Sequence, residues 1–317
     1  MLCREWPIVR AHVDVDVSAA ETREELPGVT EELQLAKSRV PQYILQHGQE
    51  AWNDAIARTT PPLPNLQTPH AGVASRAYFK LKEILKSGGI SFSKAVTLHL
   101  GEAPGGFVQA TQEVVGSNWK WIGVSIEEAG APRPSQRLPY SKGLFMTNLT
   151  GKGDLLREEC RMEVASHVFQ CSEGGADLIT ADGARQMDHA KLEEQHVDLL
   201  VVQTDVAIRC LKEGGTFICK FYEGFDERTM SWIAALTIRF EFVSIVKPAH
   251  SLCTNSERYI VATKFNGDRT PIPFDSMRVS PAWMRAFRET MGRISDHQCK
   301  ALIRALEYRS PLSHKKD

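Results

Sequence analysis

The sequence has almost no net charge, since 38 Lys and Arg residues stand against 39 Asp and Glu residues along 317 positions. No basic field surrounds the whole chain, so any surface that binds a nucleic acid has to be local. Apolar runs long enough to span a membrane are missing, and the first ten residues lack the apolar core of a signal peptide. We therefore expect an intracellular protein that does not bind a membrane.

Paired cysteine motifs are also missing. The seven cysteines are odd in number, widely spread and without CxxC spacing, which favours free thiols in a reducing compartment, the cytoplasm or the nucleus. Cys160, His167 and Cys171 lack an evident fourth ligand, so we expect no metal site. The chain also lacks a GxGxxG motif, which argues against a nicotinamide-dependent dehydrogenase.

The clearest positive signal is the stretch AVTLHLGEAPGGF, residues 95–107. Its alternating apolar residues predict a strand that ends at Gly101, and the pattern from Phe107 onward predicts a helix. A strand, a glycine-rich turn and a helix in this order hold nucleotide-like ligands in many α/β proteins, because glycine lets the backbone approach the ligand closely. Many such turns bind nothing, so the stretch alone leaves the question open.

Strands and helices alternate through the centre of the chain. The predicted helices cover 75–89, 107–114, 192–211 and 227–238, and the predicted strands cover 95–101, 119–126, 143–147, 176–182, 216–221, 242–246 and 259–264. This order predicts an α/β fold with a mainly parallel, doubly wound sheet and helices on both faces. Such sheets bind ligands at the carboxyl ends of their strands, where Gly101, Asp182 and Lys220 fall.

The two ends of the chain differ from the centre. We expect an N-terminal extension over 1–70, a core domain over 71–265 with a loop region at 148–172, and a C-terminal tail over 266–317 with helices at 281–291 and 295–308. Within the extension, the pattern predicts a strand over 8–17, a helical segment over 30–58 that breaks near Pro41, and a proline-rich linker over 59–70. The acidic residues of the extension form either a solvated face or a surface for a partner protein.

Four charged residues carry the chemistry. Lys220 lies in a strand otherwise suited to burial, where a lysine is costly unless it is paired or reaches a cleft. Asp182 ends a core strand, Glu257 precedes another strand, and Lys80 lies on the helix before the glycine-rich turn. Each has a simpler interpretation: Asp182 as a helix cap, Lys80 as a surface partner of Glu83 or Asp54, and Glu257 as a solvated charge.

Five stretches, in this order, resemble the FtsJ/RrmJ-like RNA ribose 2′-O-methyltransferases. They are SRAYFKLKEI (75–84), LGEAPGGF (100–107), ADGA (181–184), LKEGGTFICKFYEG (211–224) and VKPAHSLCTNSERYIVA (246–262). The last departs slightly in the spacing before Glu257, because it reads Ser-Glu-Arg-Tyr where the family has Ser-x-Glu-x-Tyr. The resemblance implies a Rossmann-like, S-adenosylmethionine (SAM)-dependent methyltransferase domain over 71–265, with Lys80, Asp182, Lys220 and Glu257 as its catalytic tetrad.

The resemblance also assigns the chemistry. A ribose 2′-hydroxyl must lose its proton as it attacks the methyl group of SAM, and Lys220 is the candidate base. A lysine accepts a proton only when neutral, so we expect the pKa of Lys220 to be lowered by the SAM sulfonium, by Lys80 and by partial burial. Asp182 and Glu257 would orient the two lysines and the hydroxyl.

The implied SAM site centres on the glycine-rich turn. Its expected members are Gly101, Glu102, Ala103, Pro104, Gly105, Gly106, Phe107, Glu127, Asn148, Asp154 and Asp182. Glu127 would hold the SAM ribose, although Ser125 comes first after that strand, and either Asp154 or Asn148 would lie near the adenine. Glu102 either contacts the SAM amino group or caps the following helix.

For RNA we expect a local basic and aromatic edge to the cleft. Its expected members are Arg76, Tyr78, Lys82, Arg185, Tyr222, Lys247 and Arg258. The glycine-rich turn and the TGKGDLL segment look like mRNA cap-modifying relatives, including viral ones, so capped mRNA is the favoured substrate and rRNA or tRNA the alternative. Residues 1–70 would then contact other capping or replication proteins. An alternative of another class is a catalytically silent RNA- or partner-binding module with this fold.

Overall fold

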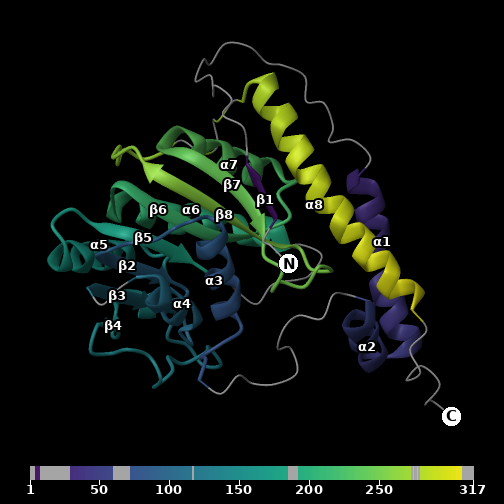
Figure 1. The fold of residues 1–317 in the computed structure, drawn as a ribbon, viewed down its shortest axis with the longest axis horizontal. Coiled ribbons are helices and arrows are strands. Elements are labelled where there is room, and N and C mark those ends of the chain that lie inside the picture. Colours follow the sequence, from purple (N-terminus) through teal and green to yellow (C-terminus); the bar gives the residue numbers. More distant parts are fainter. Residues whose placement is uncertain are drawn as a thin grey trace.

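The structure is a computed structural model that describes residues 4–7, 29–59, 72–115, 118–184, 192–272, 274, 277 and 279–308. Its centre is an eight-stranded sheet with the strand order β1-β7-β8-β6-β5-β2-β3-β4 (Figure 1). The strands are β1 (Arg4–Pro7), β2 (Ala95–Leu100), β3 (Trp119–Val124), β4 (Gly143–Phe145), β5 (Ala176–Ala181), β6 (Leu211–Tyr222), β7 (Phe240–Lys247) and β8 (Glu257–Phe265).

Most of this sheet is parallel. Strands β4, β3, β2, β5 and β6 pair in parallel, whereas β8 runs antiparallel to both of its neighbours, β6 and β7. Their side chains are almost continuously apolar and buried, which is typical of strands covered on both faces. The predicted α/β fold with a mainly parallel, doubly wound sheet is therefore confirmed.

Helices cover both faces of the sheet (Figure 1). One face carries α3 (Ala77–Ser87) and α4 (Gly106–Val114), and the other carries α5 (Glu158–Cys171), α6 (Leu192–Cys210) and α7 (Glu227–Arg239). Alternation along β6 supplies both cores, because Ile218 packs with α3 while Phe217 and Cys219 pack with the opposite helices. Because helices cover β6 on both faces, its apolar run is unbroken up to Lys220.

Three further helices come from the two ends of the chain. Helices α1 (Val29–His47) and α2 (Gln49–Thr59) pack against the C-terminal half of α8 (Pro281–Glu307) through a cluster that includes Leu33, Trp52 and Leu302. The N-terminal half of α8 adds Trp283 and Phe287 to the main core instead. Figure 1 shows α1 beside the long helix α8, so the extension and the tail meet in space.

The structure corrects three expectations about local structure. The helical segment of the extension breaks at Gly48, which has φ +87°, and runs unbroken through Pro41. The tail is one helix over 281–307, in which Met291 before the expected break and Ile294 within it both pack into the core. The expected loop at 148–172 contains the short 3₁₀ helix η1 (Thr150–Gly153) and α5.

Some expectations fall outside the described residues. These are the strand pattern at 8–17 and nearly all of the proline-rich linker. The proposed domain limits stay a prediction. Among the described helices, none is both long and apolar enough to cross a membrane.

Candidate functional site

The sheet brings the four predicted tetrad residues to one edge. Strands β5 and β6 are parallel neighbours, so Asp182 after β5 and Lys220 near the end of β6 lie at the same carboxyl edge. Strand β8 runs the opposite way, and its first residue, Glu257, is paired with Tyr222 at the end of β6. Lys80 reaches this edge from α3, which packs on the face of the sheet that carries Ile218 and Tyr259.

The four residues form two lysine–acid pairs. Lys80 Nζ lies 2.7 Å from Glu257 Oε1 and 2.8 Å from Glu257 Oε2, so one ammonium contacts both carboxylate oxygens. Lys220 Nζ lies 3.1 Å from Asp182 Oδ1 and donates a hydrogen bond of 2.6 Å to the main-chain oxygen of Asp182. Lys220 is 6% exposed and Glu257 9% exposed, so these are mostly buried ion pairs. The simpler interpretations of Lys80 as a surface partner of Glu83 or Asp54, and of Glu257 as a solvated charge, are wrong.

Neighbouring side chains fix the two acids. The Tyr259 hydroxyl donates to Asp182 Oδ1 at 3.1 Å, and the Ser251 hydroxyl donates to Glu257 Oε1 at 2.8 Å. Sequence reasoning missed both residues. The signal for Tyr259 was available, since strand alternation puts it on the same face as Glu257 and the register pairs it with Lys220.

The electrostatics of the pairs favour full charge. Burial raises the pKa of Glu257, but Lys80 and Lys220 outweigh it and lower the pKa to about 2. Burial lowers the pKa of Lys220, but Asp182, Tyr222 and Glu257 outweigh it and raise the pKa above its ordinary value. The lowering of the Lys220 pKa expected from burial and Lys80 is therefore wrong, because two acids and a phenol surround the ammonium, whereas the effect of a SAM sulfonium stays a prediction.

The glycine-rich turn is shaped by close packing. Gly101 has φ +65°, and a side chain there would collide with the backbone of Gly183, which follows the adjacent strand β5. Gly105 has φ +117°, and an added Cβ would lie 2.6 Å from Leu138 Cδ1. The Ala103 N–H donates to Ser125 Oγ at 2.7 Å, which ties this turn to the end of β3.

Glu102 lies inside this turn, almost completely buried. Its Oε1 accepts a hydrogen bond of 2.9 Å from the Val108 N–H in the first turn of α4. The interpretation of Glu102 as a cap of this helix is therefore confirmed, while its contact with a SAM amino group stays a prediction. Burial raises the pKa of Glu102 well above its ordinary value, against the opposing effect of the Val108 N–H.

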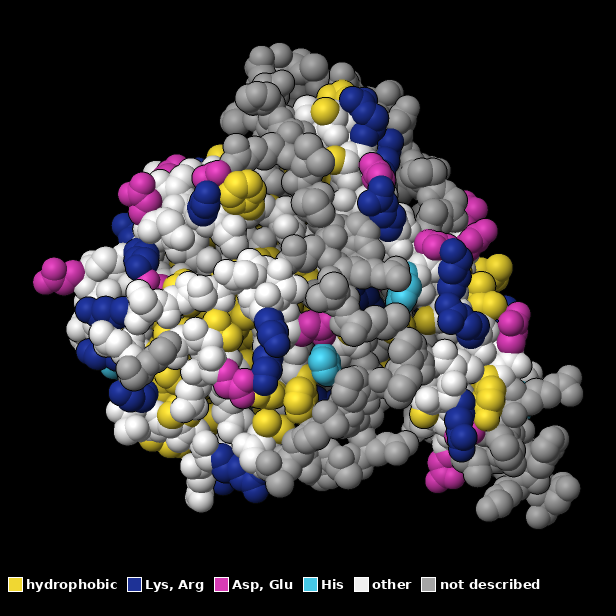
Figure 2. All heavy atoms as spheres, in the orientation of Figure 1, with side chains coloured by type: hydrophobic (Ala, Val, Ile, Leu, Met, Phe, Trp, Pro, Cys, Tyr) yellow, Lys and Arg dark blue, Asp and Glu magenta, His cyan; other side chains and the backbone are white. Residues whose placement is uncertain are grey.

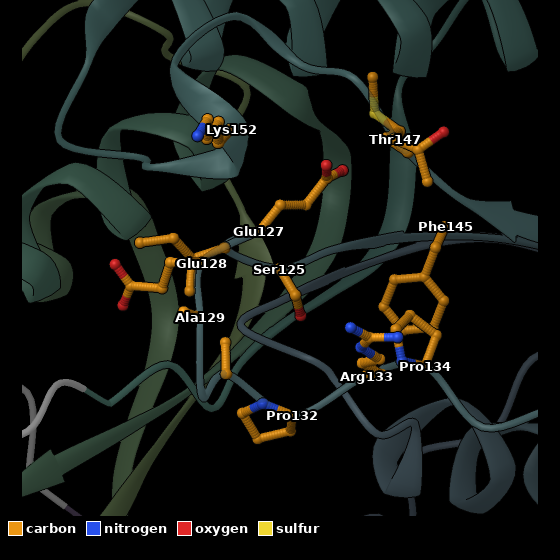
Figure 3. A pocket seen from close by; sticks show the side chains of 13 residues that line it. Ser125, Glu127, Glu128, Ala129, Pro132, Arg133, Pro134, Phe145, Thr147 and Lys152 are labelled. Carbon is orange, nitrogen blue, oxygen red and sulfur yellow. The ribbon is translucent and has the colours of Figure 1, made fainter.

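A pocket of about 540 Å³ opens beyond the ends of β3 and β4 (Figure 3). Its lining consists of Ser125, Ile126, Glu127, Glu128, Ala129, Ala131, Pro132, Arg133, Pro134, Phe145, Met146, Thr147 and Lys152. Glu127 is the one residue predicted for the cofactor that belongs to this lining, and its Oε1 accepts from the Asn148 N–H at 3.1 Å. Asn148 does not belong to this lining, but its backbone N–H holds the Glu127 carboxylate.

Asp154, the acid expected near the adenine, is placed differently from Glu127. Asp154 does not belong to the pocket lining, and its Oδ1 accepts from the Leu156 N–H at 3.0 Å in the turn before α5. Sequence reasoning missed the segment 128–134, which contributes Pro132, Arg133 and Pro134. That segment has no strand or helix periodicity, so nothing in its pattern marked it as a wall of the pocket.

Three of the residues predicted to contact RNA are buried. Arg258 is fully buried beneath α8, and Lys247 donates from Nζ to the main-chain oxygens of Asn255 and Glu257, at 2.9 and 2.8 Å. Tyr78 is 7% exposed, and its hydroxyl donates to a Glu113 oxygen. Arg258 and Lys247 stabilise the loop around the tetrad, so their prediction as part of an RNA-binding surface is wrong for this structure.

The remaining predicted RNA contacts keep some exposure or fall outside the description. Arg76 is exposed, Tyr222 is partly exposed, and Lys82 is partly exposed in an ion pair of 2.6 Å with Glu113. Arg185 lies outside the described residues. On the face shown in Figure 2, the Lys and Arg side chains of the described residues stand in small groups among Asp and Glu, which fits the net charge of −1.

No metal site emerges from the described part of the chain, which contains no group of three or more His, Cys, Asp or Glu side chains arranged to hold an ion. The six described cysteines form no disulfide with one another.

The chain is similar in sequence to several known RNA methyltransferases. The chain is 29% identical over 283 residues to the cap-specific mRNA (nucleoside-2′-O-)-methyltransferase 2 of Drosophila melanogaster, which covers 79% of this chain and 38% of the fly protein. It is 27% identical over 201 residues to the ribosomal RNA large subunit methyltransferase E of Methanocaldococcus jannaschii, covering 62% of this chain and 75% of the relative. It is also 26% identical over 231 residues to the AdoMet-dependent rRNA methyltransferase spb1 of Neurospora crassa, covering 72% of this chain and 25% of the relative.

A solved structure has the same fold. A Plasmodium falciparum protein described as a ribosomal RNA methyltransferase superposes with a TM-score of 0.50 at 23% identity, covering 62% of this chain and all of that protein. The chain spans less than half the length of the fly and fungal relatives. The sequence model of the FtsJ-like methyltransferases matches residues 73–265, the segment that holds the whole tetrad and the pocket. The chain therefore belongs to the FtsJ-like methyltransferase family.

Proposed function

We propose that this chain transfers a methyl group from SAM to a ribose 2′-hydroxyl of RNA. The observation that carries the proposal is the convergence of Lys80–Glu257 and Lys220–Asp182 at the carboxyl edge of the sheet. Two lysines and two acids on one buried edge supply a proton acceptor and the charges that orient it. The resemblance to the FtsJ-like family implies 2′-O-methylation by this combination, and the name of the fly relative states 2′-O transfer, whereas the name of the archaeal relative states rRNA methylation.

The residues present fit SAM. The pocket beyond β3 and β4 combines the carboxylate of Glu127, suited to ribose hydroxyls, with the apolar walls of Ile126, Pro132 and Phe145, suited to an adenine ring. The glycine-rich turn leads from this pocket towards Asp182, because Ser125 holds Ala103 and Gly101 touches Gly183. We infer that Glu127 holds the nucleoside end and that the turn faces the methionine end.

In the proposed mechanism, SAM supplies a methyl group on a positively charged sulfonium. Lys220 accepts the proton of the 2′-hydroxyl, and it can do so only after its own ammonium has released a proton to solvent. Asp182 and Glu257 oppose that release, because they stabilise the charged form of Lys220. A second positive charge brought near this edge favours that loss. Lys80 holds Glu257 with both carboxylate oxygens engaged, and Tyr259 holds Asp182, so the acids keep a fixed orientation during the transfer.

We propose capped mRNA as the substrate. The alignment with the fly cap-specific enzyme extends over 79% of this chain, whereas the alignment with the archaeal rRNA enzyme covers 62%. The additional similarity reaches beyond the methyltransferase core shared by both groups. The second candidate, rRNA, is favoured by the names of the archaeal and fungal relatives. The cytoplasm or nucleus, where such RNA occurs, is the proposed location, while a viral origin and protein partners of residues 1–70 stay predictions.

The test uses radiolabelled SAM with three acceptors: capped RNA lacking ribose methylation, the same RNA without a cap, and ribosomes. We expect transfer to the first nucleotides of capped RNA, mapped by nuclease digestion, and its loss in Lys220→Ala under single-turnover conditions. Transfer to ribosomes alone overturns the cap proposal, and full transfer by Lys220→Ala overturns the mechanism. SAM binding without transfer to any acceptor favours the catalytically silent module.

A further inference from the structure

The residues on either side of Glu257 are both held by helices from outside the segment that matches the family. Residues 73–265 carry the family match, whereas α1 precedes it and α8 follows it. Ser256 contacts a side chain of α1, and Arg258 contacts side chains of α8. The acid that pairs with Lys80 therefore has its backbone fixed on both sides by these two helices.

The contact with α1 is a three-residue network. Lys37 Nζ of α1 donates to Ser256 Oγ at 3.0 Å and forms an ion pair with Glu223, which follows β6. The Ser256 hydroxyl donates to Glu223 Oε1 at 2.8 Å, and the Glu223 N–H donates to the Ser256 main-chain oxygen at 3.1 Å. Side chains of Lys37 and Glu223 are 27% and 26% exposed, so the pair is partly shielded from water.

The contact with α8 completes the arrangement. Arg258 is fully buried, with its NH2 group 3.4 Å from both Ser295 Oγ and Gln298 Oε1 and its guanidinium 5.4 Å from the centre of the Phe225 ring. Gln298 also donates to the Thr254 main-chain oxygen at 3.2 Å. Because α1 and α8 pack together in one cluster that includes Leu33 and Leu302, the two contacts come from one packed helical unit, the α1–α8 unit.

We propose that Lys37 is a positioning residue for the catalytic tetrad, and that the α1–α8 unit sets the placement of Glu257 through Ser256 and Arg258. This inference rests on the proposed function and adds to it a role for segments outside the family match. Glu257 in turn holds Lys80 through both carboxylate oxygens, so a shift of the Ser256 backbone moves one complete lysine–acid pair. Displacements of about 1 Å in a reacting group lower rates by about a hundredfold.

The experiment compares Lys37→Ala with Lys37→Arg in the full chain, and Arg39→Ala serves as the matched control because Arg39 is an exposed cation on the same helix. We expect Lys37→Ala to lower kcat about tenfold or more with KM for SAM within about twofold. Lys37→Arg should restore much of kcat, since a guanidinium also donates to both Glu223 and Ser256. Arg39→Ala should match the wild type.

Hydrogen exchange provides a readout that does not depend on activity. We expect amides over 252–258 to exchange faster in Lys37→Ala than in the wild type, with Arg39→Ala unchanged. Wild-type kcat in Lys37→Ala, or unchanged exchange over 252–258, overturns this inference. Absence of transfer by the wild-type protein overturns the proposed function instead, and the exchange measurement then still decides whether Lys37 positions this segment.

Discussion

Lys80 and Glu257 are 177 residues apart in the sequence, and the ammonium of the first contacts both carboxylate oxygens of the second, at 2.7 and 2.8 Å. The pair joins a helix on one face of the sheet to the first residue of the antiparallel strand β8. Lys80 and Glu257 side chains are only 15% and 11% exposed, so water compensates little for the loss of either partner.

Lys80→Ala is expected to reduce both activity and stability. It leaves the Glu257 carboxylate buried without its main cation, and breaking a buried pair in this way costs about 3–5 kcal/mol. The pKa of Glu257 should rise from about 2, since Lys80 is the largest of the groups that lower it. Urea unfolding at pH 7 measures the loss of stability, and single-turnover methyl transfer measures the loss of activity.

The stability control for this variant is Lys82→Ala on the same helix. Lys82 pairs with Glu113 at 2.6 Å, but those side chains are 41% and 46% exposed, so the expected loss is below about 1 kcal/mol. Equal losses of stability in Lys80→Ala and Lys82→Ala would contradict the assignment of Lys80–Glu257 as a buried structural and functional pair.

The pH dependence of the reaction should differ between the free protein and its complex with SAM. The pKa of Lys220 is raised in the free protein by Asp182 and Glu257 against the effect of burial, and only the neutral lysine accepts a proton. Activity should therefore increase with pH. The ascending limb of kcat/KM for SAM, which reports the free protein, should lie at higher pH than that of kcat, which reports the complex.

Initial rates between pH 6 and 10, with protein stability checked at each pH, test this prediction, because kcat/KM for SAM should still be rising at pH 10 whereas kcat should level off at lower pH. Coinciding limbs would mean that SAM does not change the pKa of the base. Lys220→Arg is the informative variant here, because it keeps a positive charge beside Asp182 but does not lose a proton at these pH values. We expect it to fold and to be inactive throughout the range.

Gly101→Ala is expected to destabilise the protein by more than about 2 kcal/mol. The new methyl group collides with the backbone of Gly183, and φ of +65° is strained for alanine. Gly174→Ala is the matched control, because an added Cβ there meets nothing within 4 Å and its φ lies outside the left-handed region. Thermal unfolding of both variants decides the matter, and similar Tm values for the two would show that β2 and β5 separate easily.

We expect the buried His99 to lower the free energy of unfolding in acid. It is fully buried in β2, with its ring nitrogens 2.8 Å from Thr180 Oγ1 and 2.9 Å from Thr97 Oγ1, and burial lowers its pKa to about 3. The unfolded chain binds a proton below pH 6.5 while the folded protein does not, so stability falls as pH drops from 6.5 towards 3. The slope from this residue is at most about 1.4 kcal/mol per pH unit. NMR titration provides the check, since a ring that titrates near pH 6.5 contradicts burial of the neutral form.

The sequence allowed the sheet and the meeting of Asp182 with Lys220 to be predicted for a physical reason, whereas the tetrad as a set was implied by the family resemblance. Buried strands produce continuous apolar runs, and a lysine such as Lys220 within one of them has few explanations besides a site. The strand ends then place Asp182 and Lys220 together without any knowledge of the contacts. The actual partners were not predictable, because the pairing of Lys80 with Glu257 depends on how α3 lies on the sheet.

Burial of the remaining charges also escaped prediction. Arg258 follows Glu257 directly, and its charge suggested a surface that binds RNA, but β-strand alternation turns it away from the tetrad and towards α8. The position of α8 follows from packing of Trp283 and Phe287 into the main core, and α8 is a separate element that begins well after the end of β8. A local pattern contains no information about such a contact.

Glu127 and Asp154 are both expected members of the SAM site, but the structure places only Glu127 in the lining of the pocket. Glu127 lines the pocket of about 540 Å³, whereas Asp154 caps the turn before α5 through the Leu156 N–H. Loss of a carboxylate that accepts hydrogen bonds from a ribose weakens binding by about 1.5–3 kcal/mol, which is about tenfold or more in Kd. Calorimetric titration with SAM should therefore show weaker binding by Glu127→Ala and unchanged Kd for Asp154→Asn. The reverse order would place the nucleoside end of SAM next to α5 and outside the pocket in Figure 3.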